Sequence, residues 1–352
     1  MVNNKQDINN FKGMVDAKRQ HEVDREIAKL KDKHIKLEKK YRELLEDHTL
    51  LKNEYEFVNG IDLTEIQPIV VEPILDSQTS ESYYALNISD VHCLETVFPE
   101  QVNELNQYNK EICSQSMRNL WDGALSKINS HRSKTAIPKI GINILGDIIT
   151  NQLHPDQKET NQGTPMEEIM FALDVISGGI YYFLKDGNFE QIDINCCDGN
   201  HGRDDQKKIQ VANRVKHSYE WLIYKFLEKM YKDEPRIKFN IATGYLTYIQ
   251  IYDQQIRIHH GDGIRYQGGI GGLTIPMNKA IQEWNTGKQA TLDVFGHWHT
   301  SINTGQFVSN GSVIGYSPYS IWIKAKYEKP SQTGILLNKK KGITSTDKIY
   351  VR

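Results

Sequence analysis

Five short polar fragments, each placed after a strand-like run, constrain the fold of this chain more than any other feature. They occupy residues 89–92, 146–147, 199–201, 260–261 and 296–299. Each supplies carboxylate, amide or imidazole groups beside a glycine or an apolar run. The carboxyl ends of strands are where α/β proteins bind ligands. Together the fragments hold enough ligands for two adjacent divalent metal ions, so they predict an α/β fold that gathers them in one place.

Strand-like and helical segments alternate from Tyr83 onward, and the second half of the chain is rich in strands. This pattern favours two packed sheets covered by helices over one doubly wound sheet. The close succession of the strands between 237 and 259 predicts antiparallel pairing among them. The predicted helices are 99–130, 165–185 and 207–232, and the predicted strands are 83–88, 139–145, 189–197, 237–241, 245–252, 255–259 and 291–295, with short strands over 304–323.

The first sixty residues carry a heptad repeat that begins at Val23. Leucine fills nearly every d position, with lysine and glutamate between the core positions, which indicates a coiled coil or a long helical arm. We expect this helix to form a homo-oligomer; the alternative is an amphipathic helix folded back on its own domain. The a positions are Ile27, His34, Tyr41, His48 and Tyr55, and the d positions are Leu30, Leu37, Leu44, Leu51 and Val58.

The remaining chain divides by composition. Residues 61–82 place Pro68 and Pro73 on either side of a β-branched run, which predicts an extended linker after the 1–60 arm. Residues 83–325 contain all five polar fragments and form the predicted main domain. Residues 326–352 are predicted to form a charged hairpin or tail, with Gly342 following three lysines at its turn.

Composition narrows the function classes. The 352 residues are 38% hydrophobic and 25% charged, as in a soluble globular protein. A formal net charge of −2 gives no global drive toward nucleic acid or an anionic membrane, so nucleic-acid binding would need a local basic patch. The four cysteines lack C-x-x-C spacing, which predicts reduced thiols. No stretch is long and apolar enough for a membrane span or signal peptide, so we expect a cytoplasmic protein without membrane contact.

The first two fragments supply three candidate metal ligands. Asp90 and His92 stand two positions apart after a strand, so an extended backbone would project both side chains to one side. A carboxylate and an imidazole there suit manganese, iron or zinc. Asp147 follows Gly146 at the end of another strand, and one carboxylate can bridge two ions. The alternative for Asp147 is a turn residue that caps the next helix.

The third fragment offers an oxygen ligand and a proton donor. Asn200 supplies a neutral carbonyl oxygen, and His201 a group able to donate a proton. The alternative for Asn200 is a turn in which asparagine takes a left-handed conformation.

The last two fragments supply imidazoles. His260 precedes a glycine turn and is preferred as a ligand over its neighbour His259, which should point to the opposite face. His297 and His299 form a pair two positions apart, after a leading glycine. Such a pair alone is more often structural, and its position as the last of five ordered fragments is what favours metal binding.

Taken together, these fragments resemble the calcineurin-like metallophosphoesterase superfamily over roughly residues 83–323. The resemblance implies a four-layer sandwich of two mixed β-sheets between helices, and hydrolysis of a phosphate ester by a metal-activated hydroxide. It implies two divalent ions, with manganese favoured over zinc, iron or magnesium, and His201 as general acid or phosphate stabiliser. The implied ligands are Asp90, His92, Asp147 and His299 for one ion, and Asp147, Asn200, His260 and His297 for the other.

The chain departs from the family pattern at two places. Thr150 stands where many members carry a second carboxylate or histidine, and Gly202 stands where many carry an acid. These departures leave every metal position filled and bear on the substrate instead. Residues 146–159 and 199–203 also resemble phosphoesterases of bacteriophages, for which the location would be the host cytoplasm.

Three functions remain open, two of them enzymatic. A phosphodiesterase acting on DNA or RNA, resembling the nuclease subunit of double-strand-break repair complexes, is the first, with Arg203 as a substrate-binding residue. Its cations would bind backbone phosphates. A phosphomonoesterase or small-nucleotide phosphodiesterase, with the glycine-rich loop 267–272 near the ligand, is the second, and a non-enzymatic scaffold the third. The cations near the fragments are Arg203, Lys207, Lys208, Arg214, Lys216, Arg257 and Arg265.

Overall fold

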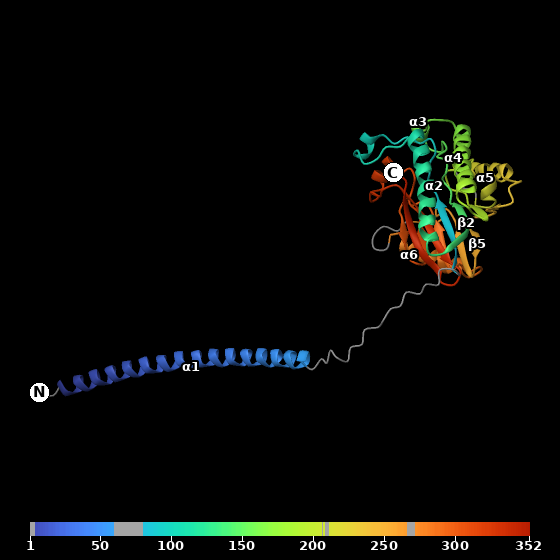
Figure 1. The fold of residues 1–352 in the computed structure, drawn as a ribbon. Coiled ribbons are helices and arrows are strands. Elements are labelled where there is room, and N and C mark those ends of the chain that lie inside the picture. The colour runs from blue at the N-terminus through green and yellow to red at the C-terminus, as the bar shows by residue number, and fades with distance from the viewer. Residues whose placement is uncertain (1–3, 60–79, 206, 208–210, 266–271) are drawn as a thin grey trace. The chain divides into compact units, whose positions relative to one another are not determined.

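The computed structural model describes residues 4–59, 80–205, 207, 211–265 and 272–352 (Figure 1). The chain forms two units, residues 1–74 and 75–352. No helix among the described residues is long and apolar enough to span a bilayer.

The described residues of the first unit form the helix α1 (Asn4–Asn59), which confirms the predicted long helix. Along the heptad its apolar side chains are exposed, and Leu44 is 69% exposed. A single helix gains little stability from such a face in water without packing against something. The coiled coil therefore stays a prediction. Most of the predicted linker, residues 60–79, lies outside the described residues.

The first sheet of the second unit has the strand order β11-β10-β1-β2-β3-β4. The four strands from β1 to β4 run parallel, and β10 and β11 are antiparallel to their neighbours. The predicted terminal hairpin thus exists, but β10 pairs with β1 at the middle of the sheet instead of forming a separate tail. The strands are β1 (Glu81–Ile88), β2 (Ala136–Ile144), β3 (Gln191–Cys196), β4 (Ile237–Ile241), β10 (Ser331–Asn338) and β11 (Gly342–Tyr350).

The second sheet is also mixed, with the order β5-β6-β7-β9-β8. The predicted antiparallel pairing holds for β5 with β6, but it is wrong for β4, which joins the first sheet in parallel with β3. The strands are β5 (Thr247–Ile251), β6 (Gln254–Ile258), β7 (Leu292–Phe295), β8 (Ile302–Asn303) and β9 (Phe307–Ser309).

Helix α4 (Pro165–Asp186) matches its prediction, and the other two predicted helices begin later than expected. In the first, only the 3₁₀ turn η1 (Pro99–Val102) forms before Asn103 turns left-handed, and α2 (Lys110–Arg132) starts after the cap Asn109. In the second, Ser218 caps α5 (Tyr219–Met230), because its side chain accepts a hydrogen bond from the Glu220 backbone. The others are η2 (Arg214–His217), α3 (Pro155–Thr160), α6 (Thr274–Trp284) and α7 (Pro318–Trp322), the last replacing a predicted strand.

Alternation along β1 shows how the layers pack. Tyr84, Leu86 and Ile88 lie in one core cluster with apolar residues of α2, α4 and α5, whereas Tyr83 and Ala85 lie in a second cluster with residues of the second sheet. A third cluster packs α6 against the other face of the second sheet. The result is four layers, helices, sheet, sheet and helix, as predicted (Figure 1).

Candidate metal centre

All five polar fragments lie in loops that follow strands, after β1, β2, β3, β6 and β7. The structure brings their side chains into three overlapping groups, in each of which the possible ligand atoms lie within 4.8 Å of one another. The groups are Asp90, His92 and His299; His92, Asp147 and His201; and Asp147, His260 and His297.

Asp147 lies between the two ends of this cluster. Its Oδ2 is 2.8 Å from Nε2 of His260, and its Oδ1 accepts a hydrogen bond from the backbone nitrogen of His201 at 2.8 Å. The Oδ1 of Asn200 also lies 3.1 Å from Nε2 of His260. Among the described residues, Asp147 is the acidic group that belongs to two of the three groups, and such a carboxylate is suited to bridge two cations.

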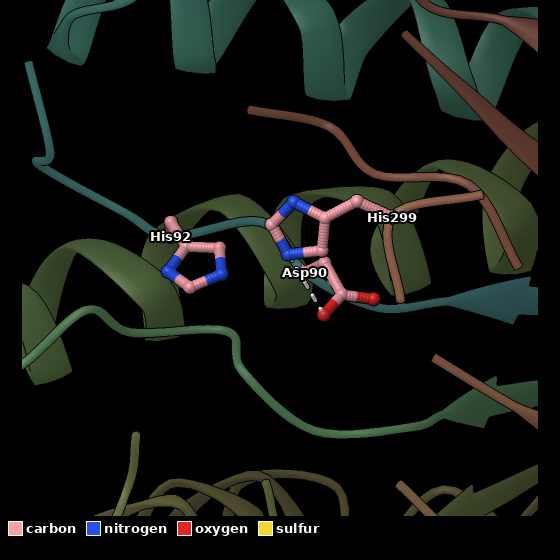
Figure 2. Close-up of side chains that lie close together, drawn as sticks. All are labelled: Asp90, His92 and His299. Atoms are coloured by element: carbon pink, nitrogen blue, oxygen red, sulfur yellow. Dashed lines mark ion pairs between the residues drawn. The ribbon is translucent and has the colours of Figure 1, made fainter. Parts of the chain in front are cut away.

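Figure 2 shows the other end of the cluster, where Asp90, His92 and His299 converge from two loops. The Oδ1 of Asp90 lies 3.3 Å from Nε2 of His299. Both carboxylate oxygens of Asp90 also accept the backbone N–H of His297 at 3.0 Å. Asp90 therefore fixes the loop that carries both histidines while keeping its oxygens in the cluster.

The backbone at these residues is left-handed. The φ angles of Asp90, His92, Asp147, His297 and His299 lie between +50° (His299) and +68° (His297). Asp90 and His92 therefore converge through a turn, and the predicted extended backbone is wrong there. Such conformations cost energy for residues other than glycine and persist where the surroundings enforce them, often at functional sites. Here the N–H groups of Asp90 and His92 bond to the carbonyls of Gly146 and Asp147.

Two glycines allow the loops after β2 and β3 to touch. A Cβ on Gly199 would lie 2.1 Å from Oδ1 of Asp147, and one on Gly146 would lie 2.4 Å from the backbone nitrogen of Gly199. Gly146 also has a φ of +88°. Both glycines are thus required by the close approach of the loops that carry Asp147 and Asn200.

Hydrogen bonds fix the tautomers of two histidines. Nδ1 of His260 donates to the carbonyl of Leu145 at 2.7 Å, and Nδ1 of His201 donates to the carbonyl of Thr150 at 2.9 Å. A carbonyl can only accept, so Nε2 of each neutral ring carries a lone pair. Nε2 of His92 is buried and has no hydrogen-bond partner among the described residues. This arrangement is typical of metal-binding histidines.

Charge and burial set the protonation of the cluster. Burial lowers the pKa of His92 well below its ordinary value, and burial together with His260 lowers the pKa of His297 to about 4. Burial acts on His260 as well, but the carboxylate of Asp147 outweighs it and raises the pKa of His260 to about 10. Burial would raise the pKa of Asp147, and the neighbouring histidines instead hold it well below its usual range. Metal ions bind neutral imidazoles and ionised carboxylates, so a cation at His260 would have to displace the proton that Asp147 stabilises there.

Two buried glutamates hold the loops that carry these ligands. Glu220 of α5 accepts the backbone N–H groups of Ile148 and Gly199, both at 2.6 Å. Glu168 of α4 accepts the N–H groups of Thr150 and Asn151 at 3.2 Å and 2.8 Å. Neither glutamate is among the site residues predicted from the sequence. In the sequence, each appears only as an acidic residue within an otherwise apolar helix face. Without the fold, such a residue is expected to face solvent.

Thr150, where many family members carry a carboxylate or histidine, supports the cluster without joining it. Its Oγ1 donates to Oε2 of Glu95 at 3.0 Å, and Nδ1 of His92 lies 3.5 Å from the same carboxylate oxygen. His259, the rejected alternative to His260, stacks on Phe295 in the core of the second sheet with centroids 5.0 Å apart. It points away from the cluster, as expected.

The predicted cations differ in burial and in the partners that they contact. Arg214 is buried and pairs with Asp198 and Asp262, each at 2.7 Å, and Arg257 is buried against Asp293 at 2.6 Å. These two arginines neutralise internal carboxylates, so their expected role near a substrate is wrong. Arg203 donates to the backbone carbonyls of Asn200 and Asp205.

The remaining predicted cations are either exposed or lie outside the described residues. Lys207, Lys216 and Arg265 are exposed. Lys208 and residues 267–271 of the glycine-rich loop lie outside the described residues.

These residues fit a pair of divalent cations. The donor set is carboxylate, amide oxygen and imidazole, which suits manganese, iron or zinc. The orphaned Nε2 of His92 and the ionised Asp147 are buried groups that a cation would satisfy. Asp90, His92, Asp147 and His299 would hold one ion, and Asp147, Asn200, His260 and His297 the other.

Comparisons with known proteins leave the family open. No protein-family model matches the chain, and no curated protein matches its sequence. Among solved structures, a dimetal phosphatase from Danio rerio is 10% identical over 77% of this chain and 99% of its own, with a TM-score of 0.33. Vps29 complexed with zinc from Entamoeba histolytica is 10% identical over 76% and 99%, at 0.30. A hypothetical protein from Pyrococcus horikoshii is 13% identical over 76% and 88%, at 0.36. Similarities this low carry no weight for function, which must be inferred from the site.

Proposed function

We propose that the chain is a dinuclear metal-dependent phosphoesterase. One observation carries the proposal: the buried Asp147 belongs to two groups of candidate ligands, one with His92 and His201 and one with His260 and His297. Two adjacent cations of this kind suit displacement at phosphorus, because they can hold both the attacking and the leaving oxygen. The donor residues come from five separate loops, an arrangement that a merely structural cluster would not need.

The protein's own residues divide into ligands and a proton donor. When two divalent ions are bound, the available chemistry is neutralisation of phosphate charge and a lowered pKa for coordinated water. His201 lies beside Asp147, with Nδ1 held on the carbonyl of Thr150. Any proton that it donates must therefore be carried on Nε2. In that form His201 protonates or stabilises the departing oxygen of the ester.

Within this class, the proposed substrate is nucleic acid and the reaction phosphodiester hydrolysis. An aromatic and cationic surface segment supports it: Tyr319 and Trp322 are 70% and 82% exposed, and Lys324 and Lys326 follow them. The chain just after this segment is tied to the loop that carries His299, since Glu328 accepts the backbone N–H of Ser301. Bases stack on exposed aromatic rings, and lysines pair with the phosphates between them.

The alternative is a phosphomonoesterase or small-nucleotide phosphodiesterase. It is favoured by the internal pairing of Arg214 and Arg257, which removes two of the cations that would have bound a polymer. Arg203 remains the proposed substrate-binding arginine under both alternatives.

Hydrolysis of bis-p-nitrophenyl phosphate and of p-nitrophenyl phosphate, each with manganese, zinc or chelator, is the first test. It shows whether the chain is a phosphoesterase and whether it prefers a diester. We expect metal-dependent hydrolysis with the diester preferred. No hydrolysis with any metal would refute the phosphoesterase, and a preferred monoester would refute the nuclease alone.

Labelled single- and double-stranded DNA and RNA then test the polymer. W322A should weaken cleavage of single strands while leaving the small diester unaffected. Y181A, which removes an exposed tyrosine (61%) of α4, is the matched control.

A further inference from the structure

Helix α1 exposes a continuous apolar seam. Leu30, Leu37, Leu44 and Leu51 occupy successive d positions and are 61–69% exposed. The a positions Ile27, Tyr41 and Tyr55 are likewise exposed, so the helix does not cover this face with residues of its own unit. A 56-residue helix with such a seam gains its stability by packing on something else.

The charges beside the seam indicate what that partner is. In a parallel, in-register pair of helices, each g residue faces the e residue five positions later on the other helix, and these contacts set partner choice and orientation. Of the six such contacts between residues 19 and 59, four join opposite charges, one joins a lysine to a leucine and one joins a glutamate to an asparagine. The pairs are Arg19 with Asp24, Glu26 with Lys31, Lys33 with Glu38, Lys40 with Leu45, Asp47 with Lys52, and Glu54 with Asn59. The chain is thus complementary to a second copy of itself.

The opposite orientation lacks this complementarity. An antiparallel pair with a fully overlapped core, Ile27 opposite Leu51, brings g residues against g residues and e against e. It would place Glu26 against Glu54, Glu38 against Glu38 and Lys40 against Lys40 of the other copy, which are like charges. Only two of its contacts, Lys33 with Asp47 and Asp24 with Lys52, join opposite charges.

The a positions favour a defined register. His34 and His48 occupy two of them. Polar residues at a positions fix register and oligomeric state at some cost in stability. In a parallel pair each histidine meets its own counterpart, so the register with every histidine matched is also the register with the matched charges.

We propose that α1 of one chain binds α1 of a second copy in a parallel, in-register, two-stranded coiled coil. The main domain would then be present twice in each particle, carried on one shared stalk. This inference is independent of the chemistry at the metal centre.

Charge-reversed full-length chains test it. The variant K31E/K33E makes positions 26, 31, 33 and 38 all acidic, and E26K/E38K makes them all basic. We expect the wild-type chain to have twice the mass of 40.6 kDa by light scattering. Each variant should dissociate at concentrations at least about ten-fold higher than the wild type, because four attractive contacts become repulsive. An equimolar mixture should recover a dimer containing one of each, because every contact is again attractive.

Controls separate pairing from folding. K29E/K39E changes the net charge equally at positions outside the seam and should keep the wild-type mass. Circular dichroism should show that every variant retains its main domain. For orientation, L51C should cross-link to its counterpart with a short bis-maleimide, because the antiparallel pair would place Leu51 opposite Ile27 and far from the other Leu51. N53C, outside the seam, should not cross-link. The four native cysteines are buried and do not compete.

The proposal fails if the wild-type chain is a monomer at tens of micromolar, as a helix folded back on its own domain would be. It also fails if the mass corresponds to three or more copies. Folded variants that keep the wild-type mass, or a mixture that does not recover pairing, would equally overturn it.

Discussion

Oε2 of Glu220 lies 2.6 Å from the backbone nitrogen of Gly199, and its other oxygen lies at the same distance from the nitrogen of Ile148. One side chain of α5 thus ties the loop after β2 to the loop after β3. Asp147 and Asn200 stand next to the two bonded residues. The position of Asp147 therefore depends on a residue that is not among the proposed metal ligands.

E220Q should lower the affinity for manganese about 10–100-fold, the usual effect of removing a group that orients metal ligands. The amide can accept one of the two N–H groups, but its NH₂ then faces the other. Isothermal titration with manganese measures the affinity, and E228Q on the same helix, at a half-buried position paired with Lys225, is the control. Equal affinities for E220Q and the wild type would show that Glu220 has no such role.

D147N should lower the number of bound ions below one per chain, whereas D90N should keep about one. The difference follows from the shared position of Asp147 and the one-sided position of Asp90. Elemental analysis after loading with manganese or zinc and desalting gives the stoichiometry. D122N, at an exposed position of α2, should retain two ions. Two ions on D147N would contradict a bridging carboxylate.

Glu168 should make stability depend on pH. Burial raises its pKa to about 8 from an ordinary value of 4.5, although N–H donors partly offset the effect. Above about pH 4.5 the unfolded chain loses this proton while the folded chain keeps it. The Glu168 contribution to the free energy of unfolding therefore falls as pH rises toward 8, by on the order of 1 kcal/mol per pH unit.

E168Q cannot titrate, so its deficit relative to the wild type should shrink between pH 5 and pH 8. Urea unfolding at several pH values measures this difference. A deficit that stays constant or grows with pH would mean that Glu168 is ionised in the folded protein.

Two adjacent glycines of α4 should respond oppositely to alanine. A Cβ on Gly179 would lie 1.8 Å from Cε2 of Trp121, so G179A should cost about 1–3 kcal/mol by overpacking. A Cβ on Gly178 would meet no atom within 4 Å, so G178A should gain up to about 1 kcal/mol from helix propensity. Thermal unfolding of both variants gives the comparison, and similar midpoints would contradict the packing of α2 on α4.

Much of the architecture could be predicted because its signals are local. Apolar runs such as 140–145 predict the ends of their strands to within a few residues, and leucines at successive d positions predict α1. Sheet membership is different, because it depends on contacts between distant segments. Nothing near Ile237 distinguishes a strand that pairs in parallel with β3 from one that begins an antiparallel meander.

The same distinction between local signals and contacts of distant segments applies to the candidate site. The residue types at Asp90, Asp147 and His297 could be recognised from the strands before them, but not their left-handed backbone, which neighbouring loops enforce. Arg214 and Arg257 looked like surface cations because their carboxylate partners are distant in sequence or in space until the fold forms.

The position of β10 has a consequence for synthesis on the ribosome. Asn87 and Thr333, joined by a hydrogen bond between β1 and β10, are 246 positions apart. During synthesis, the edge of β1 that pairs with β10 therefore stays unpaired until the residues near Thr333 have been translated. Asp90 lies in the loop directly after β1. We expect nascent chains of intermediate length to engage chaperones through that edge and to become competent for metal uptake only late.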